Sequence, residues 1–530
     1  MNNGEKQVLV LAGEKNMVFL DKAKNLKTDF IKEETYPESI IEVKKNEKYF
    51  QGWKIEKKED IEKLNQKSFA KGDSIILDFG THQVGYLNLS IKTAGSPPDA
   101  PLRFKLTFGE MPCEIGEDFA DYDGWLSSSW LQEEIKTIDV LPTEITLPRR
   151  YAFRYLQLEV IDTSSKYEVV FDKISCTSVT TADQNKVKKL PEAVSENLKE
   201  IDKVANRTLK NCMQSVFEDG PKRDRRLWLG DLRLQALANY HTFENYDLVK
   251  RCLYLFAALP LENGEVAANL FMEPEPQPDD TMLYDYSLFF AVTLYDYYLY
   301  SNDLKTLEEL WPTAKRQIEL GLERLNNNYL VEDSKNWWAF IDWTEGLNKQ
   351  ASAQAILIYS LKRGVKIAEE LNELELADYY RKKIKLTSQA AHKYLWDENK
   401  KIFISGKEKQ TSWASQIWMV LAGILDKKES NNLLNRIMNY SEALKITTPY
   451  MYHHLVEAFI KSDNKEKGLE ILNYYWGAMI DDGADCFWEL YDPEDKSFSP
   501  YGSNLINSYC HAWSCTPSYF IRKYYPDYEF

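Results

Sequence analysis

The chain has 530 residues, of which 44% are hydrophobic and 28% charged, proportions typical of a folded globular protein. Its 66 Lys and Arg against 82 Asp and Glu give a net charge of −16, which excludes nucleic acid and anionic membrane as electrostatic partners. Aromatic residues make up 13% of the chain, a surplus that indicates either a large core or faces that contact flat, weakly polar ligands such as sugars.

The sequence also lacks several common signals. No stretch approaches the ~20 apolar residues of a membrane-spanning helix, and the apolar run over residues 8–12 is shorter than the ~7–15 residues of a signal-peptide core. The seven cysteines are scattered and form no CxxC pair, which is typical of reduced, buried thiols. Because no HExxH, Walker A or GxGxxG motif occurs either, we expect a cytoplasmic protein without a metal or cofactor.

The first third of the chain predicts antiparallel β-structure. Apolar and polar residues alternate over residues 87–91, 102–108 and 156–160, and a period of two indicates half-buried strands. A break rich in Gly and Pro over residues 94–98 separates two of these segments. We therefore predict a β-sandwich domain over residues 1–185.

The pattern changes near residue 185, where apolar positions begin to recur every three or four residues, as in Val194, Leu198 and Ile201. About twelve helical segments follow, the clearest near 281–300, 304–325, 350–371 and 375–395. No βαβ alternation and no 34- or 40-residue repeat occurs. These features favour a ring of helical hairpins over residues 186–530, with an α-solenoid or a bundle as alternatives.

Residues 219–231 form the densest charged cluster, with the sequence DGPKRDRRLWLGD. Gly220 and Pro221 are expected to end the preceding helix. Asp224 and Asp231 are seven residues apart, so they would share one face of a helix. A charged surface loop is the alternative, and it leaves the interleaved Gly, Pro and Trp228 unexplained.

Further clusters set polar groups among aromatic residues. They lie at residues 340–346 with Asp342, 485–493 with Glu489, and 508–513 with His511. The alternatives are a helix cap for Asp342, a surface loop for Glu489 and a half-buried structural role for His511. A carboxylate buried among aromatic rings, such as Glu489, is expected to have a raised pKa.

The tryptophans support a ligand cleft. Eleven of the 14 lie between Trp228 and Trp513, and several fall in predicted connections rather than on helix faces. Two carboxylates on either side of a sugar are what glycosidic cleavage requires, because one protonates the leaving oxygen while the other activates water or attacks directly.

The cluster at residues 219–231 resembles the signature of bacterial α-L-rhamnosidases, glycoside hydrolase family 78. Residues 475–489 look like the family segment that carries the general base, and residues 510–513, followed by Pro517, are similar to its closing motif. Shorter matches at residues 78–80, 108–110, 285–287 and 340–343 occur in family order, so the resemblance covers most of the chain.

The resemblance implies an (α/α)6 barrel preceded by β-sandwich domains, and inverting hydrolysis of terminal α-L-rhamnose that needs no metal. It implies Glu489 as general base and Asp224 as general acid. The residues it implies in rhamnose binding are Asp219, Arg223, Trp228, Asp231, Trp343 and His511. We expect Asp342, Trp488 and Trp513 to line the same sugar pocket.

The sequence departs from the family pattern in two respects. Many members carry a glutamate as acid, one position beyond an aspartate in a slightly longer loop, whereas here Arg225 follows Asp224. Aspartate is shorter by one C–C bond of ~1.5 Å, so the backbone must come closer to the substrate. The chain also has room for only one β domain, so we expect small rhamnosylated glycosides or oligosaccharides as substrates and consider a homodimer as the assembly.

Other functions remain open at this point. One is a helical-barrel glycosidase that acts on another deoxy-sugar or on a uronide. Another is a non-catalytic carbohydrate-binding protein on the same scaffold.

Overall fold

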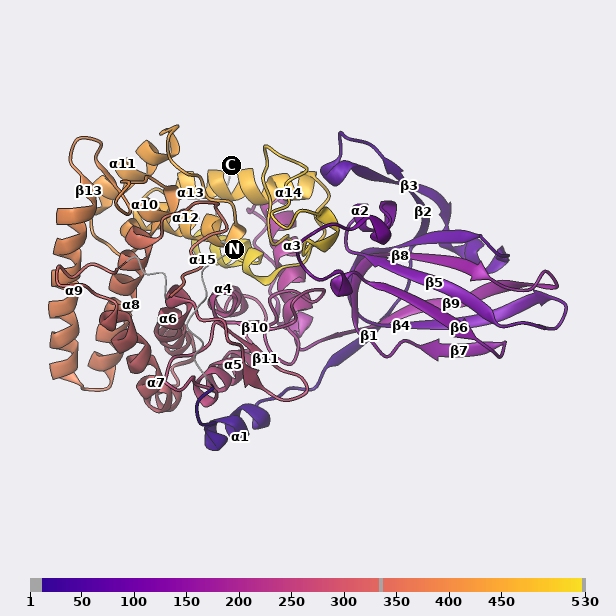
Figure 1. Cartoon of the computed structure of the whole chain (residues 1–530), viewed down its shortest axis with the longest axis horizontal. Coiled ribbons are helices and arrows are strands. Elements are labelled where there is room, and N and C mark those ends of the chain that lie inside the picture. The colour runs from indigo at the N-terminus through magenta and orange to yellow at the C-terminus, as the bar shows by residue number, and fades with distance from the viewer. Residues whose placement is uncertain (1–11, 333–336, 527–530) are drawn as a thin grey trace.

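The computed structural model describes residues 12–332 and 337–526, and most of the short N-terminal apolar run (residues 8–11) lies outside that part. An antiparallel β domain forms one end of the molecule and a helical domain the other (Figure 1). The predicted fold class, a β domain followed by a helical barrel, is confirmed. The predicted boundary at residues 185/186 falls between the last strand of the sheet, which ends at Thr180, and the helix that begins at Glu196.

The β domain is an antiparallel sheet that bends over its own core. Its strands are β1 (Ile31–Thr35), β2 (Ser39–Lys45), β3 (Trp53–Asp60), β4 (Ser74–Gly95), β5 (Leu102–Gly109), β6 (Glu133–Ile138), β7 (Thr143–Thr146), β8 (Tyr151–Asp162) and β9 (Tyr167–Thr180). The long strand β4 pairs with β8 through its first half and with β9 and β7 through its second half. Each segment with period-two alternation lies in one of these strands, and its apolar side chains are buried between the layers.

The N-terminal segment differs from the prediction. Met17–Asn25 forms helix α1, which packs on the helical domain rather than on the sheet (Figure 1). The N–H of Asn16 donates to the carbonyl of Ala258, and Lys22 forms an ion pair with Glu309. Part of the predicted β region therefore belongs to the surface of the helical domain.

Inner and outer helices alternate along the helical domain. The helices are α3 (Glu196–Cys212), α4 (Leu229–Asn239), α5 (Tyr246–Ala258), α6 (Tyr284–Ser301), α7 (Leu304–Glu323), α8 (Gln350–Glu370), α9 (Leu374–Leu395), α10 (Trp413–Leu421), α11 (Lys427–Met438), α12 (Pro449–Lys461), α13 (Lys465–Leu472), α14 (Ala478–Asp481) and α15 (Pro517–Tyr524). The helices α4, α6, α8, α10 and α12 contact one another in that order, and α7, α9, α11 and α13 each cover one of them from outside. The four clearest predicted helices correspond to α6, α7, α8 and α9.

Burial follows this arrangement. Every residue of α4 and of α10 is buried, whereas the outer helices α9 and α11 bury only one face. A helix buried on all sides belongs to an inner ring, and a helix with one apolar stripe covers it.

Among the described residues, none of the helices combines the length and apolar character that a bilayer crossing requires. All seven cysteines are buried and unpaired. Ion pairs between Lys222 and Glu114 and between Arg150 and Glu218 join the two domains, at the segments that precede α4.

Candidate active site

Asp219 shapes the turn that carries the proposed acid. Its Oδ2 accepts the N–H of Asp224 at 3.0 Å and its Oδ1 accepts the N–H of Arg226 at 3.0 Å. Burial and the nearby charge of Asp224 raise the pKa of Asp219 to about 7. The segment is not helical until Leu229, so Asp224 and Asp231 do not share a helix face as predicted. Asp224 instead lies on the turn, with its side chain 23% exposed.

Glu489 lies in the loop that follows α14, and other loops fix its backbone. Its N–H donates to the carbonyl of Ser508 at 3.0 Å, and its own carbonyl accepts the indole N–H of Trp513 at 2.9 Å. The carboxylate is buried, which excludes the surface-loop alternative. Oε2 accepts from Arg223 Nη2 at 2.5 Å, and Oε1 accepts from the hydroxyl of Tyr501.

The expected raised pKa of Glu489 is wrong in sign. Burial does push the pKa upward, but the positive charges of Arg223 and His511 and the hydrogen bond from Tyr501 outweigh it and lower the pKa. The carboxylate is therefore held in its ionised form.

Arg223 connects the two carboxylates. The same guanidinium that contacts Glu489 places its Nη1 3.8 Å from Oδ1 of Asp224. Its Nε donates to the carbonyl of Ile506 at 3.1 Å, and its plane lies over the ring of Tyr501, 4.6 Å from the ring centroid. The structure thus brings Asp224 and Glu489, 265 positions apart in the sequence, to one buried arginine.

His511 and Asp231 lie beside this group. His511 Nε2 is 3.3 Å from Oδ1 of Asp231, and Ala512 N–H donates to the carbonyl of Asp219 at 2.7 Å. Burial would lower the pKa of His511, but the carboxylates of Asp231, Glu489 and Asp219 raise it. In the described part of the chain, neither imidazole nitrogen nor Asp231 Oδ1 has a well-aligned hydrogen-bond partner.

Three of the predicted tryptophans gather in this region. Trp343 is half-buried beside Tyr501, with ring centroids 6.1 Å apart, and its indole N–H has no partner among the described residues. Trp513 lies 4.4 Å from the ring of His511. Trp228, on the short strand β10 (Leu227–Trp228) before α4, is half-buried and reaches this group through intervening rings, because it contacts Tyr286, which packs on Phe340 beside Trp513.

Two other predicted pocket residues occupy different positions. Trp488 is 1% exposed and stacks on Phe50 of the β domain, with ring centroids 4.0 Å apart. Asp342 is also buried, and its oxygens accept hydrogen bonds from Thr344, Thr447 and Thr448 at the start of α12. Trp488 therefore packs the domain interface, and Asp342 anchors the loop that carries Trp343.

The sequence reasoning missed Tyr501 and the support from the β domain. A single tyrosine between Pro500 and Gly502 carries no pattern that would distinguish it. Lys222 is 1% exposed, and its ammonium donates to Glu114 Oε1 at 2.6 Å and to the carbonyl of Asn507 at 2.6 Å. Glu114 lies close in sequence to the short family match at residues 108–110. That match was the one sequence signal that the β domain contributes to the site.

A cluster of metal-ligand residue types lies behind the catalytic loops. The ligand atoms of His82, Cys486 and Cys510 are all within 4.8 Å of one another and are buried. His82 Nε2 bonds Glu110 Oε1 at 2.9 Å, and Nδ1 lies 2.8 Å from the amide nitrogen of Asn211. Both ring nitrogens of His82 therefore already have protein partners. The cluster connects His82 of the β domain to the loops that carry Cys486 and Cys510.

Two family models match the chain, one for each domain. Residues 192–524 match the family model described as the bacterial alpha-L-rhamnosidase 6 hairpin glycosidase domain. The chain belongs to this family of α-L-rhamnosidases, glycoside hydrolase family 78. Residues 37–178 match the alpha-rhamnosidase N-terminal domain of the same family. No curated protein matches the sequence.

Solved structures extend the likeness over both domains. A rhamnosidase from Klebsiella oxytoca with rhamnose bound is 48% identical, with a TM-score of 0.94 over 97% of this chain and 100% of that chain. A family 78 rhamnosidase from Bacillus sp. GL1 is 20% identical, with a TM-score of 0.71 over 84% of this chain and 46% of the other. An α-L-rhamnosidase from Streptomyces avermitilis complexed with L-rhamnose is 15% identical, with a TM-score of 0.65 over 94% and 44%, and at this identity it shares the fold alone.

Proposed function

We propose that this family 78 protein removes terminal α-L-rhamnose from small glycosides with inversion of configuration. Asp224 donates a proton to the glycosidic oxygen as the bond between that oxygen and the anomeric carbon breaks. A water attacks the anomeric carbon from the opposite face and gives its proton to Glu489, so the first product is β-L-rhamnose. Two carboxyl groups ~6.5–9.5 Å apart leave room for that water.

The observation that carries the proposal is the buried ion pair between Arg223 and Glu489. A general base must be ionised before it can accept a proton, and Arg223, His511 and Tyr501 keep Glu489 in that state. Asp224 lies on the other side of the same guanidinium and is part exposed, so its carboxyl is accessible to a leaving group. Glu489 and Asp224 therefore supply one base and one acid, and both lie beside the guanidinium of Arg223.

The neighbouring groups support a neutral sugar as the substrate. Nδ1 of His511 and the indole N–H of Trp343 are buried polar groups without a protein partner among the described residues, and the hydroxyl groups of a neutral sugar could supply those partners. A uronide would add a further carboxyl group to a site that already holds Asp219, Asp224, Asp231 and Glu489 against the two cations Arg223 and His511. The rhamnose in the Klebsiella oxytoca relative supports rhamnose among the neutral sugars.

The test separates the two carboxylates by leaving group. Asp224→Asn should lose most activity on an alkyl rhamnoside, where the leaving oxygen needs a proton, and much less on 2,4-dinitrophenyl rhamnoside, where it does not. Glu489→Gln should lose on the order of 10²–10⁴-fold on both substrates, since general base catalysis contributes that much. Near-full activity in either variant would refute its role, and an α anomer as first product in NMR would refute inversion. A panel of aryl deoxy-glycosides and uronides tests the sugar.

A further inference from the structure

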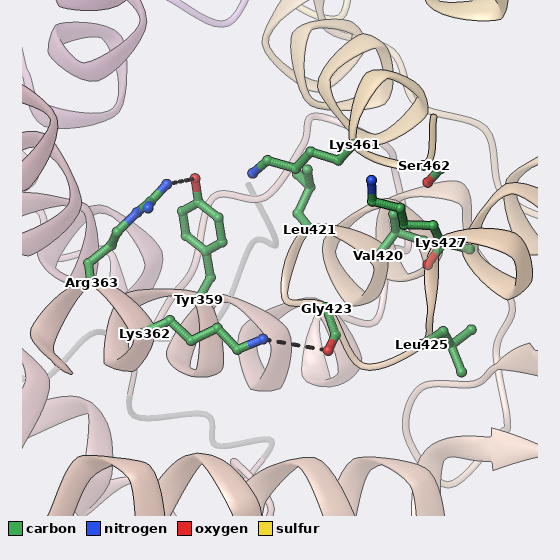
Figure 2. A pocket seen from close by; sticks show the side chains of 11 residues that line it. Tyr359, Lys362, Arg363, Val420, Leu421, Gly423, Leu425, Lys427, Lys461 and Ser462 are labelled. Atoms are coloured by element: carbon green, nitrogen blue, oxygen red, sulfur yellow. Dashed lines mark hydrogen bonds between the residues drawn. The ribbon is translucent and has the colours of Figure 1, made fainter. Parts of the chain in front are cut away.

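A second cavity lies far from the proposed active site, at the other end of α12. Asp342 binds Thr448 at the N-terminal end of this helix, whereas Lys461, its last residue, lines the cavity. The helix has 13 residues, so the two places are ~18–20 Å apart along its axis. The cavity has a volume of about 360 Å³, within the ~300–1,000 Å³ of small-molecule sites. Its walls come from α8, α10, α11 and α12 (Figure 2).

The lining of this cavity is cationic. Lys362, Arg363, Lys427 and Lys461 all contribute to it, and no Asp or Glu does, although the whole chain carries a net charge of −16. Two of the four cations already have a carboxylate partner. Lys427 pairs with Asp463 at 2.9 Å, and Lys461 pairs with Glu457 at 2.8 Å.

Lys362 and Arg363 have no carboxylate within ion-pair distance among the described residues. Lys362 donates to the carbonyls of Ala422 and Gly423, at 2.5 and 3.5 Å. Arg363 donates to the hydroxyl of Tyr359 at 3.1 Å, and its Nε is buried without a partner. Lys362 therefore brings a charge to the cavity wall that no described carboxylate pairs, and the charge of Arg363 is offset only from beyond ion-pair distance, by Asp296.

Tyr359 in the cavity wall is surrounded by cations. Its hydroxyl accepts a hydrogen bond from Arg363 at 3.1 Å, and Lys461 Nζ lies 5.0 Å from its ring centroid (Figure 2). The hydroxyl also accepts a hydrogen bond from Arg233 at 3.1 Å, although Arg233 itself lies 3.5 Å from Asp296 and 3.8 Å from Glu457. Burial would raise the pKa of Tyr359, but Arg363, Lys461 and Arg233 together lower it. The lowered pKa of the buried Tyr359 thus reflects the cations around its hydroxyl.

We propose that this cavity binds a compact dianionic oxyanion, a phosphate group that is either free or part of a small phosphate monoester. An arginine with a free N–H beside lysines is the donor set that proteins use for phosphate. The hydroxyl of Ser430, which also lines the cavity, adds a further donor. A dianion would compensate the charges of Lys362 and Arg363, which form no ion pair with a described carboxylate. This inference does not depend on the rhamnosidase chemistry.

The direct test is isothermal titration calorimetry of the full-length protein with inorganic phosphate, glucose 6-phosphate and glucose, at one fixed ionic strength. We expect saturable binding of at least one phosphate compound and none of glucose. Tighter binding of glucose 6-phosphate would indicate a monoester, and tighter binding of inorganic phosphate a free ion. Absence of saturable binding for both would overturn the proposal.

Variants locate the site. Lys362→Met combined with Arg363→Met should weaken binding at least tenfold, whereas Lys366→Met, an exposed lysine on the same helix α8, should not change it. Lys427→Met offers a second probe, because its side chain is 67% exposed and its removal does not threaten folding; it should also weaken binding. Equal binding by Lys427→Met and the wild-type protein would overturn the proposal. Binding lost in Arg223→Met would place the anion in the active site instead, because Arg223 is the cation there, and would also overturn it.

Discussion

Arg223 and Glu489 form an ion pair that is almost completely buried, with Nη2 and Oε2 2.5 Å apart. The two residues come from different loops, one before α4 and the other after α14. Because Arg223 also lies 3.8 Å from Asp224, this one side chain sets both the charge of the proposed base and its position relative to the proposed acid.

The first prediction concerns the pH dependence that Arg223 imposes. The pKa of Glu489 is lowered in the folded protein, so the base is ionised above that pKa and activity falls as the pH drops through it. In Arg223→Met the pKa should rise by ~1–3 units, since a neighbouring arginine has an effect of that size. The acid limb of kcat/KM should move to higher pH by the same amount.

The measurement is a pH–rate profile with an aryl rhamnoside. Arg225→Met is the matched control, because Arg225 donates to the carbonyl of Arg150 and does not contact Glu489. An unchanged acid limb in Arg223→Met would show that another group controls it.

The second prediction concerns Tyr501, whose hydroxyl donates to the other oxygen of Glu489. Hydrogen bonds to charged groups contribute ~1.5–3 kcal/mol, so Tyr501→Phe should lower kcat/KM on the order of tenfold to a hundredfold. The acid limb should move upward by less than in Arg223→Met, because the tyrosine carries no charge. Tyr440→Phe removes a similar hydroxyl-to-glutamate bond at the surface and should leave the profile unchanged. Equal shifts of the acid limb in Arg223→Met and Tyr501→Phe would contradict this ranking.

The sequence predicted the secondary structure well where periodicity is long. The segments near 281–300 and 350–371 correspond to α6 and α8, because their apolar faces repeat over several turns. Helix α1 was missed because it is short and its support comes from a distant segment, as in the bond from Asn16 to Ala258. The hydrophobic pattern within a short segment cannot predict a packing partner that lies more than 200 positions away in the sequence.

The candidate site shows the same limit. Family motifs led to Asp224 and Glu489, but the sign of the pKa shift at Glu489 was predicted wrongly. The aromatic neighbours of Glu489 are visible in the sequence, whereas Arg223, which decides the charge balance, is 266 positions away. Trp488 shows the converse case, since its place beside Glu489 in the sequence does not bring its ring to the same side.

The third prediction concerns stability at the domain interface. Lys222 and Glu114 form a buried ion pair between the helical and β domains. Removing Glu114 leaves the buried ammonium of Lys222 with the more distant carboxylate of Glu110, 3.7 Å away, and breaking a buried pair costs up to ~3–5 kcal/mol. Glu114→Ala should therefore lower the midpoint of urea unfolding strongly.

The double variant Glu114→Leu with Lys222→Met removes both charges and should recover much of that loss, because apolar replacements of buried pairs are often neutral. Asp172→Asn breaks an exposed pair with Lys92 and should leave the midpoint unchanged. A midpoint for Glu114→Ala equal to that of the wild-type protein would mean that Lys222 is compensated elsewhere.

The fourth prediction concerns Gly220, which permits the close approach of the turn that carries Asp224 to the segment that contains Ser508. A Cβ at this position would lie 2.7 Å from the hydroxyl of Ser508 and still closer to the carbonyl of Arg223. The carbonyl belongs to the backbone that carries Asp224, so the turn would have to move. Because small displacements of catalytic groups can cost on the order of a hundredfold, Gly220→Ala should lower kcat by about that factor. Gly477→Ala is the matched control, since its nearest neighbour, Ile201 Cδ1, is 4.0 Å away. Wild-type kcat in Gly220→Ala would show that the turn has freedom that the packing around Asp224 does not suggest.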